Sequence, residues 1–151
     1  MLLRGKESTP ATVQARSDLV REHLPPIDTV TAIIATKSGA VGSYLHSAGS
    51  NLSLFDWDIG YEGGSVRVVG ERVTVTPVGS EPVVKEFTRN WCVVEEVAAW
   101  AKAIEDGVQN ELQRPEEALA DLEFLEKLFL SGERGGELQR YEYQLDTKLT
   151  S

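Results

Sequence analysis

Tyr44 and His46 are two side chains of this sequence that could take part in proton transfer. One residue separates them in GSYLHSAG, residues 42–49, and side chains alternate along a strand, so both would project from one face. Histidine titrates near neutral pH, so His46 could act as a general base while the Tyr44 hydroxyl donates a hydrogen bond. The preceding predicted strand offers Thr31 as a further polar contact. The simpler interpretation of a lone strand histidine is a structural or exposed residue.

Asp56 and Asp58, in FDWDIGY at residues 55–61, form a second candidate pair. On a strand their carboxylates would share one face about 7 Å apart. If burial separated their pKa values, one could act as an acid and the other as a base. Trp57 would lie on the opposite face, where it could contact a substrate, so the three cannot all line one pocket. The simpler interpretation of the two aspartates is a solvated strand face.

The sequence shows no nucleotide or metal motif. The glycines of GYEGGSVRVVG, residues 60–70, lack the G-x-G-x-x-G spacing. After these glycines, apolar and polar residues alternate with period two, which predicts a strand. A phosphate-binding loop needs a helix at this place. We interpret this segment as a hairpin turn. Cys92 is the one cysteine, and with His23 and His46 it gives no zinc-ligand spacing. We therefore predict no cofactor and no metal.

Composition and charge exclude several classes of partner. The 151 residues carry 15 Lys and Arg against 24 Asp and Glu, and a net charge of -9 opposes binding to nucleic acid or anionic lipid. No apolar run reaches the ~18 residues of a membrane span, and residues 1–10 lack the apolar core of a secretory signal. We predict one cytoplasmic domain over residues 1–151, without nucleic-acid or membrane partners.

Strand patterns precede helix patterns along the chain. Short runs rich in Val, Ile, Thr and aromatic residues fill residues 12–88. Helical spacing follows over residues 93–106 and again from Pro115, where the apolar stripe is Leu119, Leu122, Leu125, Leu128 and Phe129. This order predicts an α+β fold, an open and mostly antiparallel β-sheet with the two C-terminal helices packed on one face. Residues 137–151 would form a tail or an edge strand.

The C-terminal half resembles a known domain. NWCVVEEVAAWAKAIEDGVQNELQRPEEALADLEFLEKLFLSGERGG, residues 90–136, is similar to the C-terminal domain of the glucose-fructose oxidoreductase / inositol dehydrogenase (Gfo/Idh/MocA) family, of the fungal type. The segments TPATVQARSD, PPIDTVTAIIATKSGAVGSYLHS and WDIGYEGGSVRVVGERVTV look like its successive strands, so the resemblance covers residues 9–136. It implies a sheet with helices on one face. The other face would contribute to a substrate cleft and to subunit contacts.

The resemblance also implies what the sequence lacks. In that family an N-terminal Rossmann domain binds NAD(P) and carries the lysine of an E-K-P motif. An Asp and a His follow in a glycine-rich helix motif before the first strand of the sheet domain. No residue of this sequence matches these motifs, so the resemblance assigns no catalytic residue. We therefore expect a stand-alone domain that begins at Met1 and is redox-incompetent by itself.

The expected function is that of a homodimer joined through the sheet face, which binds an organic metabolite there. It would catalyse a cofactor-free cyclisation, isomerisation or dehydration in secondary metabolism. The catalytic candidates are His46, Asp58, Asp56 and Tyr44, and the substrate-binding candidates are Trp57 and Thr31. Two alternatives stay open: a substrate-binding and dimerisation fragment of an NAD(P)-dependent oxidoreductase, and a non-enzymatic regulatory or interaction module.

Overall fold

The computed structural model describes residues 9–88 and 92–145 and confirms the α+β class. In chain order its elements are β1 (Pro10–Asp18), β2 (Thr29–Thr36), β3 (Val41–Ser47), β4 (Asp56–Tyr61), β5 (Gly64–Val69), β6 (Arg72–Pro77), β7 (Val83–Glu86), α1 (Val93–Asp106), the short 3-10 helix η1 (Glu111–Gln113), α2 (Pro115–Glu133) and β8 (Gln139–Arg140). Seven strands therefore precede the helices, in the predicted order.

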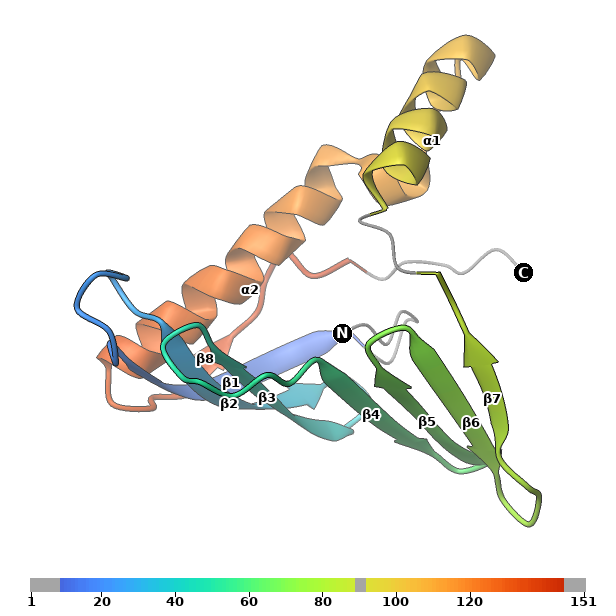
Figure 1. Cartoon of the computed structure of the whole chain (residues 1–151). Helices are drawn as coiled ribbons and strands as arrows, with labels where there is room; N and C mark the ends of the chain where they lie inside the picture. The colour runs from blue at the N-terminus through green and yellow to red at the C-terminus, as the bar shows by residue number, and fades with distance from the viewer. Residues whose placement is uncertain (1–8, 89–91, 146–151) are drawn as a thin grey trace. The chain divides into compact units, whose positions relative to one another are not determined.

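The strands form two antiparallel sheets where the sequence predicts one (Figure 1). Sheet A has the strand order β3-β2-β1-β8, and sheet B has the order β4-β5-β6-β7. No ladder pairs β3 with β4, because residues 48–55 between them form bends and irregular chain. The chain divides into two compact units, and each is described by itself. Unit A comprises residues 9–52 and 103–145, and unit B comprises residues 53–88 and 92–102. A single domain over residues 1–151 remains a prediction.

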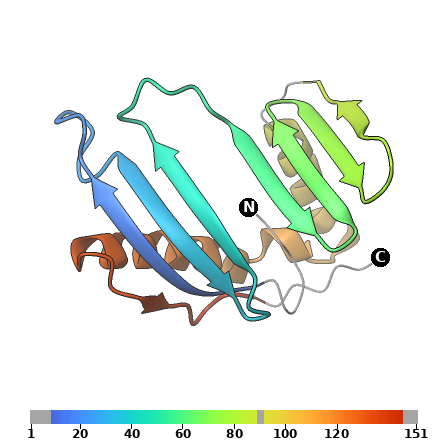
Figure 2. The same ribbon diagram turned by 90° about the horizontal axis from the view of Figure 1, so that it is seen from below.

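Sheet A packs one face against α2. The register pairs Val13 with Ile34 and Ala15 with Ala32, so these side chains share a face. All four are buried together with Leu128 of α2. Figure 2 shows β1, β2 and β3 side by side, with α2 crossing one face of them. The core of unit A is therefore one helix on one face of a four-stranded sheet.

Local signals place both ends of α2. Pro115 stands in the first turn, where its missing N–H removes no helical hydrogen bond, and two glutamates follow at the positive end of the helix dipole. After Glu133, Gly135 and Gly136 take positive φ values of 68° and 89°. Glycine adopts this conformation without strain, so the chain can leave the helix here. The predicted start of this helix is confirmed.

The buried side of α2 is not the predicted leucine stripe. Of the five stripe residues only Leu128 is buried. The other four are 40–64% exposed: Leu119, Leu122, Leu125 and Phe129. The buried positions are Ala120, Glu123, Leu128 and Ser131, and two of these are polar. A search for regularly spaced apolar residues does not detect a packed side that includes polar residues. The apolar spacing therefore predicted the helix correctly but not the side of it that packs on the sheet.

Ser131 is buried because it joins two backbone segments. Its hydroxyl accepts a hydrogen bond from the Ala15 N–H of β1 and donates one to the Glu137 carbonyl, both at 2.7 Å. Its neighbour Gly132 also lies against β1, where any Cβ would collide with the Ser17 side chain. The end of α2 is thus fixed to the sheet by one hydroxyl and one close backbone approach.

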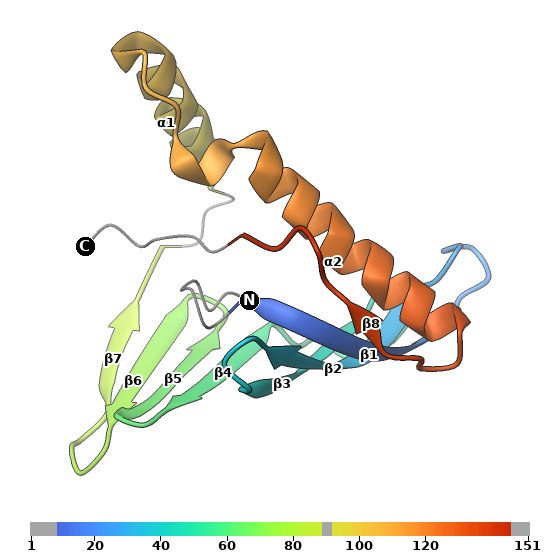
Figure 3. The same cartoon turned by 180° about the vertical axis from the view of Figure 1, so that it is seen from behind.

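Residues 139–145 of the C-terminal tail lie along α2 (Figure 3). β8 pairs antiparallel with β1, which confirms an edge strand, although it is only two residues long. Beyond β8, the buried Glu123 carboxylate accepts hydrogen bonds from the N–H groups of Glu142 and Tyr143 and from the Gln144 side chain. Burial raises the pKa of the Tyr141 hydroxyl, and the negative charge of Glu123 raises it further. One carboxylate of α2 therefore holds three successive tail residues.

Sheet B has one apolar face and one polar face. The register sets Trp57 opposite Val68 on the apolar face, and Asp58 opposite Arg67 on the polar face. Val66 lies opposite Val75 in the next pair, which confirms the alternation predicted along β5 and β6. Among residues 53–88 and 92–102, however, no side chain is buried. The apolar face of sheet B therefore has no full cover from its own unit.

α1 buries none of its described residues. The helix has the predicted bounds, and Gly107 follows it with a φ of 66°, as expected of a residue that ends a helix. Its apolar positions Val93, Val97, Trp100 and Ile104 are each more than half exposed. Of the two helices predicted to pack on a sheet face, α2 does so, and α1 leaves its apolar side exposed.

The glycine-rich segment GYEGGSVRVVG forms a hairpin, as predicted. β4 ends at Tyr61 and β5 begins at Gly64, so a strand follows the turn and no helix terminus is available for a phosphate. Gly64 has a φ of 146°, and a Cβ there would collide with the Thr76 carbonyl of β6. Gly70, with a φ of 55°, makes the next turn. These glycines meet backbone requirements of the sheet.

Asp28 holds the loop between β1 and β2. Its buried carboxylate accepts the N–H groups of Val20 at 2.9 Å and Arg21 at 2.7 Å, and the Thr29 hydroxyl at 3.0 Å. Burial by itself would raise the pKa of Asp28, but these hydrogen bonds and the Arg21 charge outweigh it and lower the pKa. The Arg21 Nε also donates to the Gly49 carbonyl at 2.9 Å, which ties this loop to the chain after β3.

Gly49→Ala is expected to lower the melting temperature by about 5 °C. A Cβ at position 49 would collide with the Asp28 carboxylate, which would have to give up its loop contacts. Gly42→Ala in β3 is the matched control, because a Cβ there meets nothing within 4 Å. Thermal unfolding followed by circular dichroism compares the two variants. Equal shifts for both would contradict this role of Gly49.

Candidate functional site

Tyr44 and His46 share a face, as predicted, but it is the face of sheet A that α2 packs on. The register sets Tyr44 opposite Ala32 and His46 opposite Val30, and both partners belong to the core. The half-buried Tyr44 ring meets Phe124 of α2 edge-on at 5.8 Å, and burial raises the pKa of Tyr44. His46 is exposed. The pair therefore lies on the face that carries the core of unit A, and a catalytic role for the two residues remains a prediction.

Thr31 lies on the opposite face of sheet A from Tyr44. Its register partners are Arg16 of β1 and Leu45 of β3, which alternate with the core residues of those strands. Thr31 and Tyr44 therefore cannot line one pocket. The error arises because neighbouring strands can pair in either of two registers, and a shift of one residue exchanges the faces.

Asp56 and Asp58 share the polar face of sheet B, as predicted. Arg67 of β5 lies against both: its Nη2 is 3.3 Å from Asp56 Oδ2, and its Nε is 3.7 Å from Asp58 Oδ1. All three side chains are open to water, with exposed fractions of 30–67%. This is a solvated ion-pair cluster, without the burial that an acid–base division needs. A catalytic role for the two aspartates remains a prediction.

Trp57 lies on the apolar face of sheet B, opposite the aspartates, as predicted. Its half-buried ring meets Phe55 edge-on, with ring centroids 6.4 Å apart. Its cross-strand neighbour in the register is the apolar Val68. Contact with a substrate remains a prediction for this residue.

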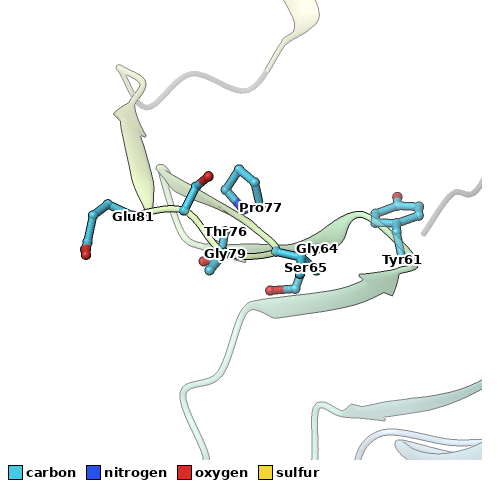
Figure 4. A pocket seen from close by; sticks show the side chains of 9 residues that line it. Tyr61, Gly64, Ser65, Thr76, Pro77, Gly79 and Glu81 are labelled. Carbon is cyan, nitrogen blue, oxygen red and sulfur yellow. The ribbon is translucent and has the colours of Figure 1, made fainter.

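A shallow hollow of about 580 Å³ opens at one end of sheet B (Figure 4). The β4–β5 hairpin forms one wall, and the turn between β6 and β7 forms the other. Its polar side chains are those of Tyr61, Ser65, Thr76, Ser80 and Glu81. Gly64 and Pro77, also in the lining, are register partners, so the two walls are joined at the base by β5–β6 pairing.

The hollow offers hydroxyl groups, one phenol ring and one carboxylate. None of its described lining residues is Lys, Arg or His. Hydroxyls can donate and accept hydrogen bonds, and an aromatic face packs on the C–H side of a ring or chain. Glu81 would repel an anion in the absence of a cation nearby. The lining therefore suits a neutral molecule that carries several hydroxyl groups.

The part of the chain that the structure describes has neither a metal-ligand cluster nor a membrane-spanning helix. In residues 9–88 and 92–145, no three His, Cys, Asp or Glu side chains gather closely enough to hold a metal ion. Over the same ranges, neither long helix has the length and apolar character that a membrane-spanning helix requires.

Comparison with known proteins identifies the type of domain. No family model matches the sequence. Dehydrogenase FPY6 of Fusarium mangiferae is 31% identical to this chain, over 95% of this chain and 43% of that protein. An oxidoreductase of Thermotoga maritima superposes with a TM-score of 0.72 at 19% identity, over 87% of this chain and 38% of its own. The chain has the Gfo/Idh/MocA C-terminal-domain fold.

Other solved structures of the Gfo/Idh/MocA type agree. An aldose-aldose oxidoreductase of Caulobacter crescentus has a TM-score of 0.73 at 14% identity, over 89% of this chain and 42% of that one. An inositol dehydrogenase homologue of Azotobacter vinelandii has a TM-score of 0.70 at 15% identity, over 87% of this chain and 43% of that one. The resemblance inferred from residues 9–136 is therefore confirmed, with a fungal dehydrogenase among the relatives. The chain spans less than half the length of each of these proteins.

The sequence analysis did not predict the hollow. A signal for it exists, because successive hairpins place the first and third turns of a meander at the same end of the sheet. The turn after Tyr61 and the turn after Pro77 are such a pair, and both contain glycine. The two turns, read together, would have located the hollow.

Proposed function

We propose that this chain is the sheet domain of a Gfo/Idh/MocA-type dehydrogenase, which binds an organic metabolite and makes subunit contacts while another domain holds the nicotinamide. The 31% identity to a fungal dehydrogenase over 95% of this chain supports the proposal. So does the lack of a G-x-G-x-x-G motif in the sequence, because such a motif would be needed to hold the dinucleotide here.

The observation that carries this proposal is the second apolar side of α2. Leu122, Leu125 and Phe129 follow one another at helical spacing and lie opposite the side that packs on sheet A. They are 40–64% exposed. A helix that is apolar on two sides is normally buried between two layers, and a row of exposed large side chains marks an interaction surface. Sheet A covers one side, and the nucleotide-binding domain would cover the other.

The hollow in sheet B is the proposed metabolite site. Among structures with this fold, one oxidoreductase is complexed with glycerol, one with NADH and myo-inositol, and one with NAD+, L-tartaric acid and magnesium. Glycerol and myo-inositol are neutral molecules with several hydroxyl groups, whereas L-tartaric acid carries two hydroxyls beside its two carboxyl groups. The hydroxyls of Ser65, Thr76 and Ser80 could exchange hydrogen bonds with such groups. We therefore propose a small, neutral polyhydroxylated metabolite.

Tyr61→Ala is expected to weaken myo-inositol binding about tenfold, because the ring forms one side of the hollow. Tyr143→Ala is the matched control, since Tyr143 has the same 54% exposure and lies outside the hollow. Two-dimensional NMR of the labelled chain measures binding and shows which amide signals move. NADH, titrated by fluorescence, should not bind. Tight NADH binding, or inositol shifts away from residues 61–81, would contradict the proposal.

A homodimer through the sheet face is part of the same proposal. The face of sheet A away from α2 carries Ile33, Val41 and Leu45, and each is at least 59% exposed. These three residues lie on β2 and β3 among polar neighbours such as Thr31, a composition that suits a subunit contact.

A cofactor-free cyclisation, isomerisation or dehydration in secondary metabolism remains a prediction, as do a non-enzymatic role and a cytoplasmic location. The positions of the residues proposed for catalysis and substrate binding do not favour a cofactor-free reaction over simple binding. Tyr44 packs on Phe124, and Thr31 lies on the other face of sheet A. Asp56 and Asp58 share an arginine on the surface of sheet B.

A further inference from the structure

Sheet B and α1 expose two apolar surfaces of different shape. The first is the apolar face of sheet B, formed by Trp57, Ile59, Val66, Val68, Val73, Val75 and Val83. The second is the α1 stripe, formed by Val93, Val97, Trp100 and Ile104. None of these side chains is buried. We propose that the α1 stripe of one copy docks on the apolar face of sheet B of a second copy, and that the contact is reciprocal. This goes beyond the proposed function, whose subunit contact lies on sheet A.

The two surfaces match in shape and size. The four residues of the α1 stripe follow the i, i+4, i+7, i+11 spacing, so they form one narrow row along the helix. With 14 residues the helix is about 21 Å long. The four strands of sheet B span about 14 Å from first to last, so the helix can cross all of them. In α+β domains a helix buries its apolar stripe against a sheet face.

The charges around the two surfaces are complementary. Lys85 is the one charged residue that the register places on the apolar face of the described strands, and it lies on the edge strand β7. In the first turn of α1, Glu96 flanks the stripe, while Glu95 lies on the side of the helix away from it. Opposite charges across an interface fix its orientation more than its strength. This pairing sets the start of α1 beside β7, close to Val83.

A second copy of the chain is the partner that satisfies both surfaces at once. Each copy supplies one helix and one sheet face, so a two-fold axis closes the contact and leaves neither surface exposed. Two helix-on-sheet contacts would bury on the order of 1,600 Å², the size of a standard stable interface. A single helix docked on an unrelated partner would leave the sheet face of unit B uncovered.

A disulfide test can detect this contact. Cys92, the one cysteine, is exposed and directly precedes α1. Val83→Cys places a second thiol on the apolar face of β7. Val84→Cys is the matched control, because its neighbouring and similarly exposed side chain points to the other face. Mild oxidation of Val83→Cys should give a covalent dimer on non-reducing gels, at least tenfold more than Val84→Cys gives.

Two other results of this test would overturn the proposal. A disulfide within one chain would show that α1 covers the sheet of its own copy. Equal dimer yields from Val83→Cys and Val84→Cys would show that the disulfides form by random collision between chains. Mass spectrometry of the linked peptides from a mixture of isotopically light and heavy chains separates these cases, because only a contact between copies gives mixed pairs.

Sedimentation of further variants separates this inference from the dimer proposed on sheet A. Trp100→Glu introduces a charge into the α1 stripe and should halve the oligomer mass. Leu45→Glu introduces a charge into the open face of sheet A, where it should leave the Val83→Cys cross-link unchanged. If Leu45→Glu alone halves the mass and Trp100→Glu has no effect, the docking of α1 is wrong while the proposed function stands.

Discussion

Glu123→Leu is expected to lower the free energy of unfolding by about 3 kcal/mol. The buried carboxylate accepts two backbone N–H groups, from Glu142 and Tyr143, and the Gln144 amide. Leucine has a similar size but no acceptor, so both N–H groups would lose their partner while the tail covers them, and the Gln144 amide would keep only its hydrogen bond to the Ala120 carbonyl. An unsatisfied buried donor costs more than the net gain from an ordinary hydrogen bond, which makes this one of the largest effects expected.

Urea denaturation measures the effect of Glu123→Leu, and hydrogen exchange locates it. Glu126→Leu, at an exposed position one turn further along α2, is the control and should change stability by less than about 0.5 kcal/mol. Glu123→Gln keeps one acceptor oxygen and should lie between the two. Exchange of the Tyr143 amide should accelerate in Glu123→Leu. A protected amide, or equal losses in the two leucine variants, would show that Glu123 does not hold the tail.

Leu128→Ala is expected to lower the free energy of unfolding by about 3 kcal/mol, because it leaves a cavity in the centre of unit A. Leu128 is 1% exposed and packs among Val13, Ala15 and Ala32 of sheet A. These neighbours belong to strands held by ladders on both sides, so they cannot collapse into the space. The lost methyl groups and the cavity therefore both contribute to the cost.

Leu122→Ala is the matched control for Leu128→Ala, on the same helix with the same chemical change. Leu122 is 64% exposed, so its truncation should cost less than about 0.5 kcal/mol in the isolated chain. Urea denaturation of both variants distinguishes the two sides of α2. Similar costs would mean that the side predicted from the leucine stripe, and not the side seen in the structure, faces the core.

Secondary structure in this chain follows from local signals. Alternation places Val66 and Val75 on one face of a strand pair, and the register agrees. Gly107 ends α1 with a positive φ, and Pro115 begins α2. Each of these signals depends on a few consecutive residues, so it can be recognised from the sequence alone. The order of strands and helices, the bounds of α1, the start of α2 and the α+β class were therefore predictable.

The packing of those elements was not predictable in the same way. Tyr44 meets Phe124, which is 80 residues away along the chain, and no periodicity contains that contact. Ser131 is buried because of the Ala15 N–H, a partner on another element. Serine is mostly exposed in proteins and tyrosine is intermediate, so the burial of Ser131 and the half-burial of Tyr44 depend on partners that only the fold supplies.

The candidate site was predictable only in part. Alternation correctly put Asp56 and Asp58 on one face and Trp57 on the other. It could not show that Arg67 pairs with both aspartates, because that depends on which residues of β5 lie opposite β4. For Thr31 and Tyr44 the same uncertainty in register led to the wrong face. The hollow needed two turns to be considered together, and each turn alone looks like an ordinary hairpin end.

The fit between Asp28 and Gly49 also limits how this loop can evolve. Any side chain at position 49 would enter the space of the Asp28 carboxylate, while a smaller residue at position 28 would leave the N–H groups of Val20 and Arg21 without an acceptor. Neither position can then change alone without a loss of stability. Among relatives of this chain the two positions should therefore vary together, with a larger residue at 49 found only where 28 is no longer an acid.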